Sequence, residues 1–416
     1  MMRASWLAMG KKIAPSAFCA ALGKRQFDSF YGVPDSLLKD LCAYVTDNYA
    51  PQNHVITANE GNAIGMAAGY HLATGKIPVV YMQNSGIGNT INPLLSLTHR
   101  EVYQIPMLML VGWRGDPGKK DEPQHVAQGR LMDACFKSAE VPYEVLEAGD
   151  NVEASLDHIL KNAENHFAKA KTPYAILIKR DTFDGYKLQK AKTPAFELEM
   201  SREKAIELVL RHINEQDIVV STTGMPSREV FEIRAAAKAG HHRDLLTVGC
   251  MGHCSSIAAG IALQKPDRSV YCIDGDGAAL MHMGSLAVNG GLGAVQPLDA
   301  AGNPQPTLLS NLKHVLINNG AHDSVGGQPT VGFDVSLSDV AKACGYRVVR
   351  SEPVIELGDL VEAMSELRAA TGPAFLEVLV KKGNRKDLGR PTTTPIQNKE
   401  AFETFVRTGK APSHLQ

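Results

Sequence analysis

A carboxylate at a glycine-rich turn offers a place where a metal ion could hold a phosphorylated ligand. Residues 269–273 are apolar and predict a strand, which runs into Gly275-Asp276-Gly277 before a helical stretch. Glycines at such a turn let backbone N–H groups approach an anion, and the following helix N-terminus adds partial positive charge. Because Asp276 would repel a diphosphate, we expect Mg²⁺ to lie between the two.

The next strand end supplies further oxygen ligands. Residues 314–318 predict a strand, and Asn319 and Ala321 follow it. The carboxyl ends of parallel strands meet at one edge of a sheet, so Asn319 can reach Asp276. Side-chain amide and backbone carbonyl oxygens are ligands that hard cations accept. A lone Gly-Asp-Gly run fits an ordinary strand-to-helix turn equally well, so the second strand end is what favours a metal site.

Together these features resemble the cofactor motif of the thiamine-diphosphate enzymes. The resemblance implies thiamine diphosphate and Mg²⁺ as cofactors. It assigns the metal to Asp276, Asn319 and the carbonyl of Ala321, and the diphosphate to Gly277 and Ala278. The stretch from Gly275 to Asn319 is longer than usual for the motif. Residues 293–306 are polar and rich in proline and glycine, so we interpret them as a surface insertion that accounts for the extra length.

Glu60 starts a helical stretch rich in alanine and glycine, residues 60–74. In isolation, an acid at this position would be explained by the helix dipole. The family resemblance implies instead that Glu60 contacts N1′ of the aminopyrimidine, so that the cofactor's own imino group can remove the C2 proton of the thiazolium. A carboxyl group desolvated against an apolar ring has a raised pKa and can share that proton.

Two more turns match positions that touch the cofactor in this family. Thr223 and Gly224 follow a predicted strand at residues 218–221 and match a diphosphate contact. The carbonyl of Gly249 would accept the 4′-amino group, and Met251 matches the bulky side chain between the two rings. A lone methionine more often fills a core, but the glycines around Met251 favour the cofactor role.

The motifs follow one another with no middle domain between them. This short form resembles the phosphonopyruvate and sulfopyruvate decarboxylases over nearly all of residues 13–395. The resemblance rests on the motifs YGVPDS (31–36), QNSG (83–86), GWRG (112–115), DEPQH (121–125), HDS (322–324) and GGQ (326–328). It implies a small anionic 2-oxo acid as substrate, and the motifs together favour decarboxylation of 3-phosphonopyruvate to phosphonoacetaldehyde and CO₂.

Four polar residues are candidates for contact with such a substrate: Gln83, Asn84, Arg114 and Lys119. Arginine binds tetrahedral oxyanions bidentately, and lysine acts as a point charge. Acidic residues interleave with the two cations and weaken the electrostatic argument, and phosphonate and sulfonate present similar oxygens. A proton donor is also required, and His125 and His322 are the candidates.

Apolar runs that alternate with helical stretches predict an α/β fold with two doubly wound parallel-sheet domains. The predicted strands lie near residues 55–58, 78–82, 107–112 and 175–179 in the first half, and near 218–221, 245–248, 270–273, 314–318 and 375–379 in the second. We expect a pyrimidine-binding domain at 13–180, a linker at 181–200 and a diphosphate-binding domain at 201–395.

The composition indicates which partners and which cellular location to expect. The net charge of −1 over 416 residues gives no indication of nucleic acid or an anionic membrane as partner. Seven scattered cysteines fit reduced thiols in a cytoplasmic enzyme, and the Cys250/Cys254 pair lacks a second pair at zinc-finger spacing. No apolar run is long enough to span a membrane. Residues 1–27 lack acids and weakly resemble a transit peptide, but a short tail before a first helix at 15–24 is the simpler interpretation.

The family resemblance also implies a homodimer or larger oligomer, since the cofactor there lies between the first domain of one subunit and the second domain of another. Four alternatives stay open: a sulfopyruvate decarboxylase, a carboligase of the acetolactate synthase type, a nucleotide-binding dehydrogenase and a non-catalytic partner subunit. Lack of a middle domain argues against the carboligase, and lack of Gly-x-Gly-x-x-Gly after the first strand argues against the dehydrogenase. Intact Glu60, Asp276 and Asn319 argue against the partner subunit.

Overall fold

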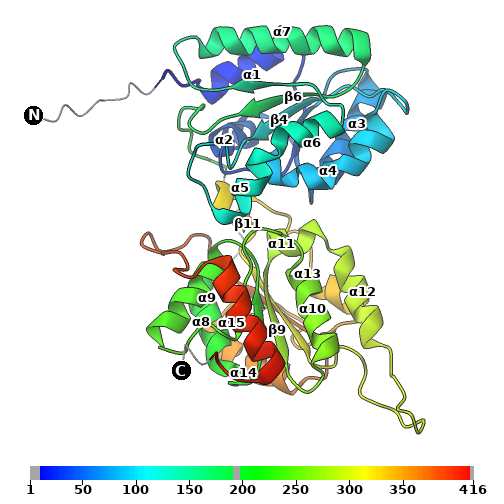
Figure 1. Cartoon of the computed structure of the whole chain (residues 1–416), viewed down its shortest axis with the longest axis vertical. Coiled ribbons are helices and arrows are strands. Elements are labelled where there is room, and N and C mark those ends of the chain that lie inside the picture. The colour runs from blue at the N-terminus through cyan, green and yellow to red at the C-terminus, as the bar shows by residue number, and fades with distance from the viewer. Residues whose placement is uncertain (1–9, 191–196, 413–416) are drawn as a thin grey trace, which may run out of the picture. The chain divides into compact units, whose positions relative to one another are not determined.

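The computed structural model describes residues 10–190 and 197–412, which form two compact α/β units (Figure 1). Unit 1 comprises Met1–Ala191 and Ser324–Gln328, and unit 2 comprises Lys192–Asp323 and Pro329–Gln416. Residues 1–9 of the transit-peptide-like tail and residues 191–196 of the expected linker lie outside the described residues.

Unit 1 is built on a six-stranded parallel sheet with the order β2-β1-β3-β4-β6-β5. Its strands are β1 (Phe30–Gly32), β2 (His54–Ile56), β3 (Val79–Gln83), β4 (Leu108–Gly112), β5 (Tyr143–Leu146) and β6 (Tyr174–Ile178). Its helices are α1 (Pro15–Gly23), α2 (Lys39–Asn48), α3 (Glu60–Thr74), η1 (Asn84–Gly86), α4 (Ile87–Pro93), η2 (Leu94–Thr98), α5 (Pro123–Arg130), α6 (Met132–Ser138) and α7 (Val152–Ala170). The central strands are buried almost throughout, as continuous apolar runs predict.

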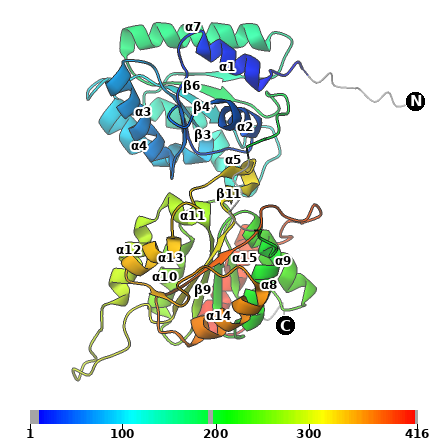
Figure 2. The ribbon, with the colours of Figure 1, turned by 180° about the vertical axis from the view of Figure 1, so that it is seen from behind.

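Helices cover both faces of this sheet, as Figures 1 and 2 show. One core packs α1, α2 and α7 against the sheet, and a second core packs α3, α4 and α6 against the opposite face. Tyr81 of β3 belongs to the first core and its neighbour Val80 to the second, because successive strand residues point to opposite faces.

The first half of the expected linker is part of unit 1. Phe183 is 4% exposed and packs edge-on against Phe18, with ring centroids 5.2 Å apart. The backbone N–H of Tyr186 donates to the carboxylate of Asp40. Tyr186 also packs edge-on against Tyr44, so two aromatic side chains within a polar stretch tie residues 181–190 to the sheet domain before them.

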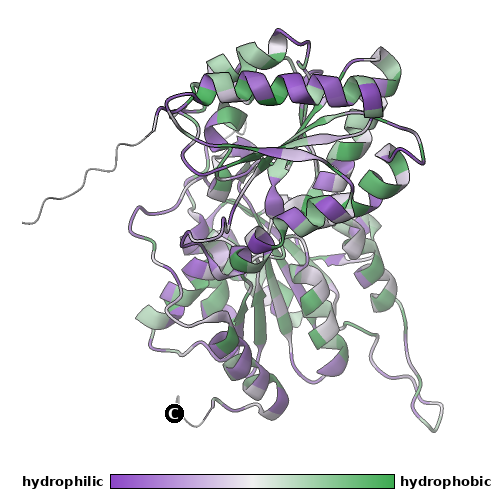
Figure 3. Cartoon of the chain, turned by 45° about the horizontal axis from the view of Figure 1, so that its top comes forward, coloured by the Kyte–Doolittle hydropathy of each residue, from purple (hydrophilic) through white to green (hydrophobic). Residues whose placement is uncertain are grey.

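Unit 2 contains a second six-stranded parallel sheet with the order β13-β14-β10-β9-β7-β8. Its strands are β7 (Ile218–Ser221), β8 (Asp244–Leu246), β9 (Val270–Gly275), β10 (Leu312–Asn318), β13 (Arg347–Val348) and β14 (Ala374–Leu379). Its helices are α8 (Arg202–His212), α9 (Met225–Ala236), α10 (Cys254–Gln264), α11 (Asp276–Met281), α12 (Gly284–Gly293), α13 (Leu337–Ala343), α14 (Leu357–Ala369) and α15 (Pro395–Thr408). The short strands β11 (Ala321–His322) and β12 (Gln328–Pro329) pair with each other. Figure 3 shows that the long strands of unit 2 are hydrophobic along most of their length.

Helix α15 begins at the residue where the second domain was expected to end. Phe402 and Phe405 pack into a core with residues of β7 and α10, so unit 2 continues through this helix. Thr394 and Gln397 cap its first turn reciprocally. The stretch after α12 is an exposed loop, in keeping with a surface insertion. Among the described helices, none combines the length and apolar character needed to cross a membrane.

Candidate active site

The carboxyl ends of β9 and β10 lie side by side in unit 2 and carry the predicted metal ligands. Ile317 of β10 is in register with Gly275 of β9, and α11 begins at the next residue, Asp276. The backbone N–H of Asn319 donates to Oδ1 of Asp276 across 3.5 Å. The structure therefore brings Asp276 and Asn319 together at one edge of the sheet, where ligands of open α/β folds bind.

The carboxylate of Asp276 is buried among neutral hydrogen-bond donors. Its side chain is 2% exposed, and Oδ2 accepts the hydroxyl of Thr330. Burial raises the pKa of Asp276 to about 6. A divalent cation would offset the cost of this buried charge, and the carboxylate, amide and carbonyl oxygens here are a donor set that Mg²⁺ accepts. The residues therefore fit the ion that the family implies.

Asp323 fixes the orientation of the Asn319 amide. It accepts Nδ2 of Asn319 at 2.8 Å, and it also binds the Arg202 guanidinium at 3.1 Å. The amide oxygen of Asn319 consequently points the other way and accepts the N–H of Ala321 at 3.1 Å. Such outer partners orient a ligand before any metal binds.

A tight loop after β8 places Met251. Gly249, Cys250 and Gly252 all have positive φ, at 74°, 53° and 88°. The hydroxyl of Thr223 accepts the N–H of Gly249 at 2.9 Å, which joins the two predicted cofactor turns. Positive φ is uncommon for a residue other than glycine, and such positions persist where the surrounding structure enforces them.

Met251 and His322 both lie over the first turn of α11. A Cβ added to Gly277 would lie 3.0 Å from Cε1 of His322 and 3.4 Å from Cε of Met251. Gly277 therefore keeps the helix start open between these two side chains. Four of the predicted residues, Met251, Asp276, Gly277 and His322, thus occupy one region of unit 2.

Glu60 is held at the start of α3 in unit 1. Asn59 caps the helix by accepting the N–H of Asn62, and Glu60 itself is 5% exposed. Its Oε2 accepts the side-chain amide of Asn89 at 2.7 Å. The carboxyl group is therefore buried at a helix N-terminus with a neutral amide as its partner.

Arg114 is engaged by groups of its own unit. Its guanidinium forms a two-pronged ion pair with Asp121, and Nη1 donates to the hydroxyl of Ser36 at 2.8 Å. Burial opposes ionisation of Asp121, but Arg114 and the backbone N–H groups of Gly115 and Glu122 outweigh it and lower the pKa of Asp121 well below its usual range. The pair fixes the loop after β4.

Asn84 and Gln83 are also engaged. The amide of Asn84 both donates to the carbonyl and accepts the N–H of Arg114, at 2.9 and 3.0 Å. Gln83 donates to the buried carboxylate of Asp35 at 2.6 Å and accepts the hydroxyl of Ser85. The contacts of Asn84 connect the loops after β3 and β4, and the contact of Gln83 with Asp35 connects the end of β3 to the loop after β1.

Lys119 lines a pocket of about 380 Å³ in unit 1. The pocket is lined by Trp113, Asp116, Lys119, Lys120, Asp121, Glu147, Ala148, Lys179, Arg180 and Asp181. Lys179 pairs with Glu147 at 2.9 Å and lies over the Trp113 ring. Lys119 is exposed, with no ion pair from its side chain within the described residues, so its charge is available to an anion.

The two candidate proton donors are neutral imidazoles near pH 7. Burial lowers the pKa of His322 to about 4. Burial, together with the nearby Arg114 charge, lowers the pKa of His125 to about 4 as well. Either ring would therefore donate a proton from a neutral N–H group, not from an imidazolium.

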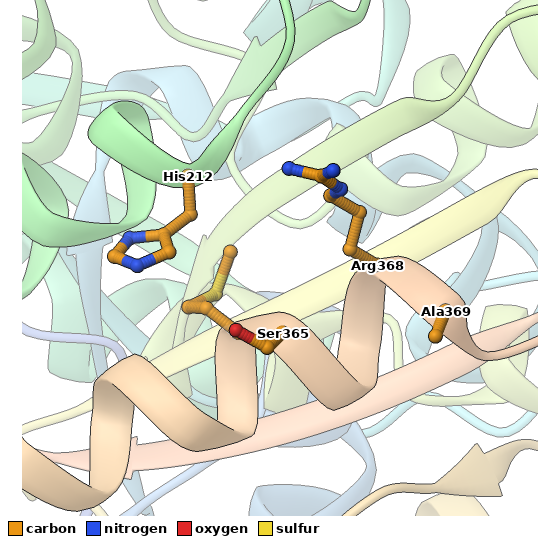
Figure 4. Close-up of a pocket in the computed structure, with 5 residues that line it drawn as sticks. His212, Ser365, Arg368 and Ala369 are labelled. Carbon is orange, nitrogen blue, oxygen red and sulfur yellow. The ribbon is translucent and has the colours of Figure 1, made fainter.

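A second pocket, of about 310 Å³, lies at the other end of unit 2 (Figure 4). His212 and Arg368 face it from the last turns of α8 and α14. The next strands, β7 and β14, start after these helix ends, so this pocket lies at the amino ends of the strands. None of the predicted site residues lines it.

Several partners of the site were not anticipated from the sequence: Asp35, Asn89, Asp121, Asp323 and Thr330. Asp35, Asp121 and Asp323 do lie inside motifs that the resemblance used, but a motif does not say which group a carboxylate contacts. Thr330 is more than fifty residues from Asp276 in the chain and follows no strand that the sequence predicts.

Comparison with known proteins agrees with this geometry. Residues 14–135 match the N-terminal TPP binding domain of thiamine pyrophosphate enzymes, and residues 222–291 match the C-terminal TPP binding domain. A phosphonopyruvate decarboxylase of Streptomyces viridochromogenes is 33% identical over 91% of both chains. The chain belongs to the thiamine-diphosphate-dependent decarboxylases. Its fold, its enzyme class as a carbon–carbon lyase and its organic cofactor are thereby confirmed.

Two further relatives are similar to this decarboxylase over most of its length. A phosphonopyruvate decarboxylase of Streptomyces hygroscopicus is 33% identical over 95% of this chain and 94% of its own length. A sulfopyruvate decarboxylase of Methanosarcina acetivorans is 27% identical over 90% of this decarboxylase and 92% of its own length. Both kinds of relative span the two units without a middle domain.

Proposed function

We propose that this decarboxylase converts 3-phosphonopyruvate to phosphonoacetaldehyde and CO₂, with thiamine diphosphate and Mg²⁺ as cofactors. The observation that carries the choice of substrate is the match at 33% identity, over 91% of both chains, to a phosphonopyruvate decarboxylase. Sulfopyruvate is the second candidate, because a sulfopyruvate decarboxylase matches 90% of the chain at 27% identity.

Four residues carry the cofactor contacts that matter most in this proposal. Asp276 and Asn319, with the carbonyl of Ala321, would bind Mg²⁺ at the diphosphate. The bound thiazolium supplies an electron sink for the bond that breaks as CO₂ leaves. Glu60 would hold a proton at N1′ of the aminopyrimidine, and its contact with Asn89 keeps the carboxyl group in place for that exchange.

The candidate substrate residues differ in the contacts that their side chains already make. Lys119 has a charge to offer the phosphonate. Gln83 lies at the carboxyl end of β3 and already contacts Asp35 and Ser85, so it would reach the substrate only by exchanging one of these partners. Arg114 and Asn84 act as positioning residues, since each is bound to its neighbours in unit 1. His322, beside Gly277, is the better placed of the two candidate proton donors.

We also propose that the protein works as a homodimer or a larger homo-oligomer. The support is the family resemblance, in which the cofactor lies between the first domain of one subunit and the second domain of another. Analytical ultracentrifugation of the cofactor-loaded protein should show no active monomer. Full activity in a monomeric fraction would contradict this part of the proposal.

The decisive experiment measures CO₂ release from phosphonopyruvate, with and without added thiamine diphosphate and Mg²⁺. The proposal requires release that depends on the cofactors, with kcat/KM for sulfopyruvate and pyruvate lower by about tenfold or more. A higher kcat/KM for sulfopyruvate would identify sulfopyruvate as the substrate and leave the proposed decarboxylation unchanged. Cofactor binding without release from any of the three acids would overturn the proposed reaction and favour a carboligase or a partner subunit.

A further inference from the structure

A second group of metal-ligating side chains lies in the core of unit 2, apart from the residues placed at the cofactor. Cys272 and Asp274 are two residues apart on β9, so their side chains leave the same face of the sheet. His314 of β10 is in register with Cys272. One ligand atom from each of the three lies within 4.8 Å of the other two, and all three residues are buried.

His314 is a buried imidazole without a hydrogen-bond partner among the described residues. The side chain is 1% exposed, yet neither ring nitrogen has a hydrogen-bond partner within the described residues. The nearest charged group is the carboxylate of Asp274, 3.6 Å from Nε2. A buried polar group without a partner is destabilising, and a bound cation would give the imidazole a partner.

A second thiol, that of Cys254, lies beside Cys272 but donates to the carbonyl of Val220, so it is a neighbour of the group and not a member of it. Cys254 begins α10, and its Sγ lies 3.5 Å from Sγ of Cys272. Both residues are free thiols in the structure. The three residues that do converge offer one sulfur, one imidazole and one carboxylate, which are ligand types that Zn²⁺ accepts. Mg²⁺ prefers oxygen alone, so this group and the Asp276 group select different metals.

We propose that Cys272, Asp274 and His314 bind one thiophilic divalent cation, Zn²⁺ in the first instance. The charges balance, because one thiolate and one carboxylate neutralise a divalent ion, and a buried ion requires such neutralisation. This set differs from the Cys250/Cys254 spacing in the sequence, since Cys250 is exposed.

The proposed ion would join the two strands that deliver the magnesium ligands. Asp274 lies two residues before Asp276 on β9, and His314 lies on β10, which ends just before Asn319. A metal between them would fix the relative position of the strand ends. Burial raises the pKa of the Cys272 thiol, so metal uptake has to displace its proton. The inference is independent of the substrate proposed above.

The alternative arrangement contains no metal. His314 and Asp274 would then face each other with no ion between them, and burial would keep the two thiols protonated. The metal content of the protein decides between the two arrangements.

The test uses the full chain, loaded with thiamine diphosphate and Mg²⁺, exposed to Zn²⁺ and then freed of loosely bound metal. Elemental analysis should find about one zinc ion per chain. Cobalt taken up in place of zinc should give a thiolate-to-cobalt absorption band. Cys272→Ser and His314→Gln should each weaken zinc binding by about tenfold or more. Cys135→Ser, which changes a half-buried thiol in unit 1, serves as the control.

Two results would overturn the inference. One is wild-type protein that holds no zinc and shows no cobalt–thiolate band after loading, whatever the variants do. The other is a folded Cys272→Ser protein, verified by circular dichroism, that keeps the wild-type zinc content and affinity. Because the readout is metal content and not turnover, a failure of the proposed reaction would leave this test unaffected.

Discussion

The carboxyl group of Glu60 lies directly against the backbone of Gly86, with no room for a side chain between them. A Cβ added to Gly86 would come closer than 3.0 Å to Oε1, Cδ and Cγ of Glu60. Asn89 donates to the other carboxylate oxygen from α4. The QNSG motif therefore ends in glycine because the acid at the start of α3 occupies the adjacent space.

Gly86→Ala should displace the Glu60 carboxyl group and lower kcat by about 10²-fold, because an error of about 1 Å in a catalytic group costs that much. The matched control is Gly88→Ala, two residues further on, where no atom lies within 4 Å of the added Cβ. Steady-state kinetics of both variants provide the measurement. Equal activity in the two proteins would mean that the position of Glu60 does not limit the reaction.

Glu60→Gln keeps an oxygen that can accept from Asn89, and it removes the exchangeable proton. We expect kcat to fall by at least about 10²-fold, while thiamine diphosphate still binds with wild-type affinity by isothermal titration. Glu101→Gln, an exposed acid in the same unit, should change neither value. Near-full activity in Glu60→Gln would remove this residue from the mechanism.

The regular elements could be predicted where composition or a long apolar run marked them, whereas the buried strand β1 was missed because it has only three residues. Strand β7 follows the predicted range, and α3 begins and ends where its composition indicates. The edge strand β5 was missed because its residues are only partly buried and it contains Glu144. Helix α15 was missed because a polar, proline-containing stretch precedes it, although Phe402 and Phe405 are buried.

The site could be predicted only as far as strand topology determines it. Asp276 and Asn319 meet because each follows one of two neighbouring parallel strands, which the sequence indicates. The partners of these residues lie on loops: Thr330 reaches Asp276, and Asp323 reaches Asn319. A loop conformation depends on many tertiary contacts at once, so no local pattern reveals which side chain meets which.

Asp276 should make the stability of the metal-free protein depend on pH. Its pKa rises from 3.8 in the unfolded chain to about 6 in the fold, because burial disfavours the charge. The folded state thus binds this proton more tightly, and stability falls by up to about 3 kcal/mol as pH rises from about 4 to about 6. Thermal midpoints of wild type and Asp276→Asn across this range measure the effect, since the variant lacks the titration.

Added Mg²⁺ and thiamine diphosphate should raise the wild-type midpoint more above pH 6 than at pH 5, because the cation needs the ionised carboxylate. Asp276→Asn should lose most of this gain, and Asp267→Asn, an exposed acid of unit 2, should retain it. Parallel pH profiles for wild type and Asp276→Asn, with equal gains from Mg²⁺, would show that Asp276 is not a metal ligand.

The Arg114–Asp121 pair should contribute to stability more than to substrate affinity. Arg114→Met removes the nearer of two arginines from the Asp121 carboxylate, whose side chain is 5% exposed, and leaves Arg180 at 3.5 Å. The loss of stability should therefore be below the loss of about 3–5 kcal/mol that a fully unpaired buried charge causes. Replacing both residues, as Arg114→Met with Asp121→Leu, should recover much of that loss. Denaturant unfolding gives the stabilities. If KM for phosphonopyruvate stays about tenfold above wild type in the stable double variant, Arg114 binds substrate and is more than a positioning residue.

Lys119 offers the converse test, since its charge is exposed and has no ion pair within the described residues. Lys119→Met should raise KM for the anionic substrate by about tenfold, leave kcat and the unfolding midpoint unchanged, and reduce the dependence of kcat/KM on salt. The control Lys169→Met removes one positive charge from the last turn of α7 and should leave KM unchanged. An equal rise in KM for both variants would attribute the effect to net charge. An unchanged KM in Lys119→Met would place phosphonate recognition elsewhere, and the pocket beside Trp113 would then have no part in choosing between phosphonate and sulfonate.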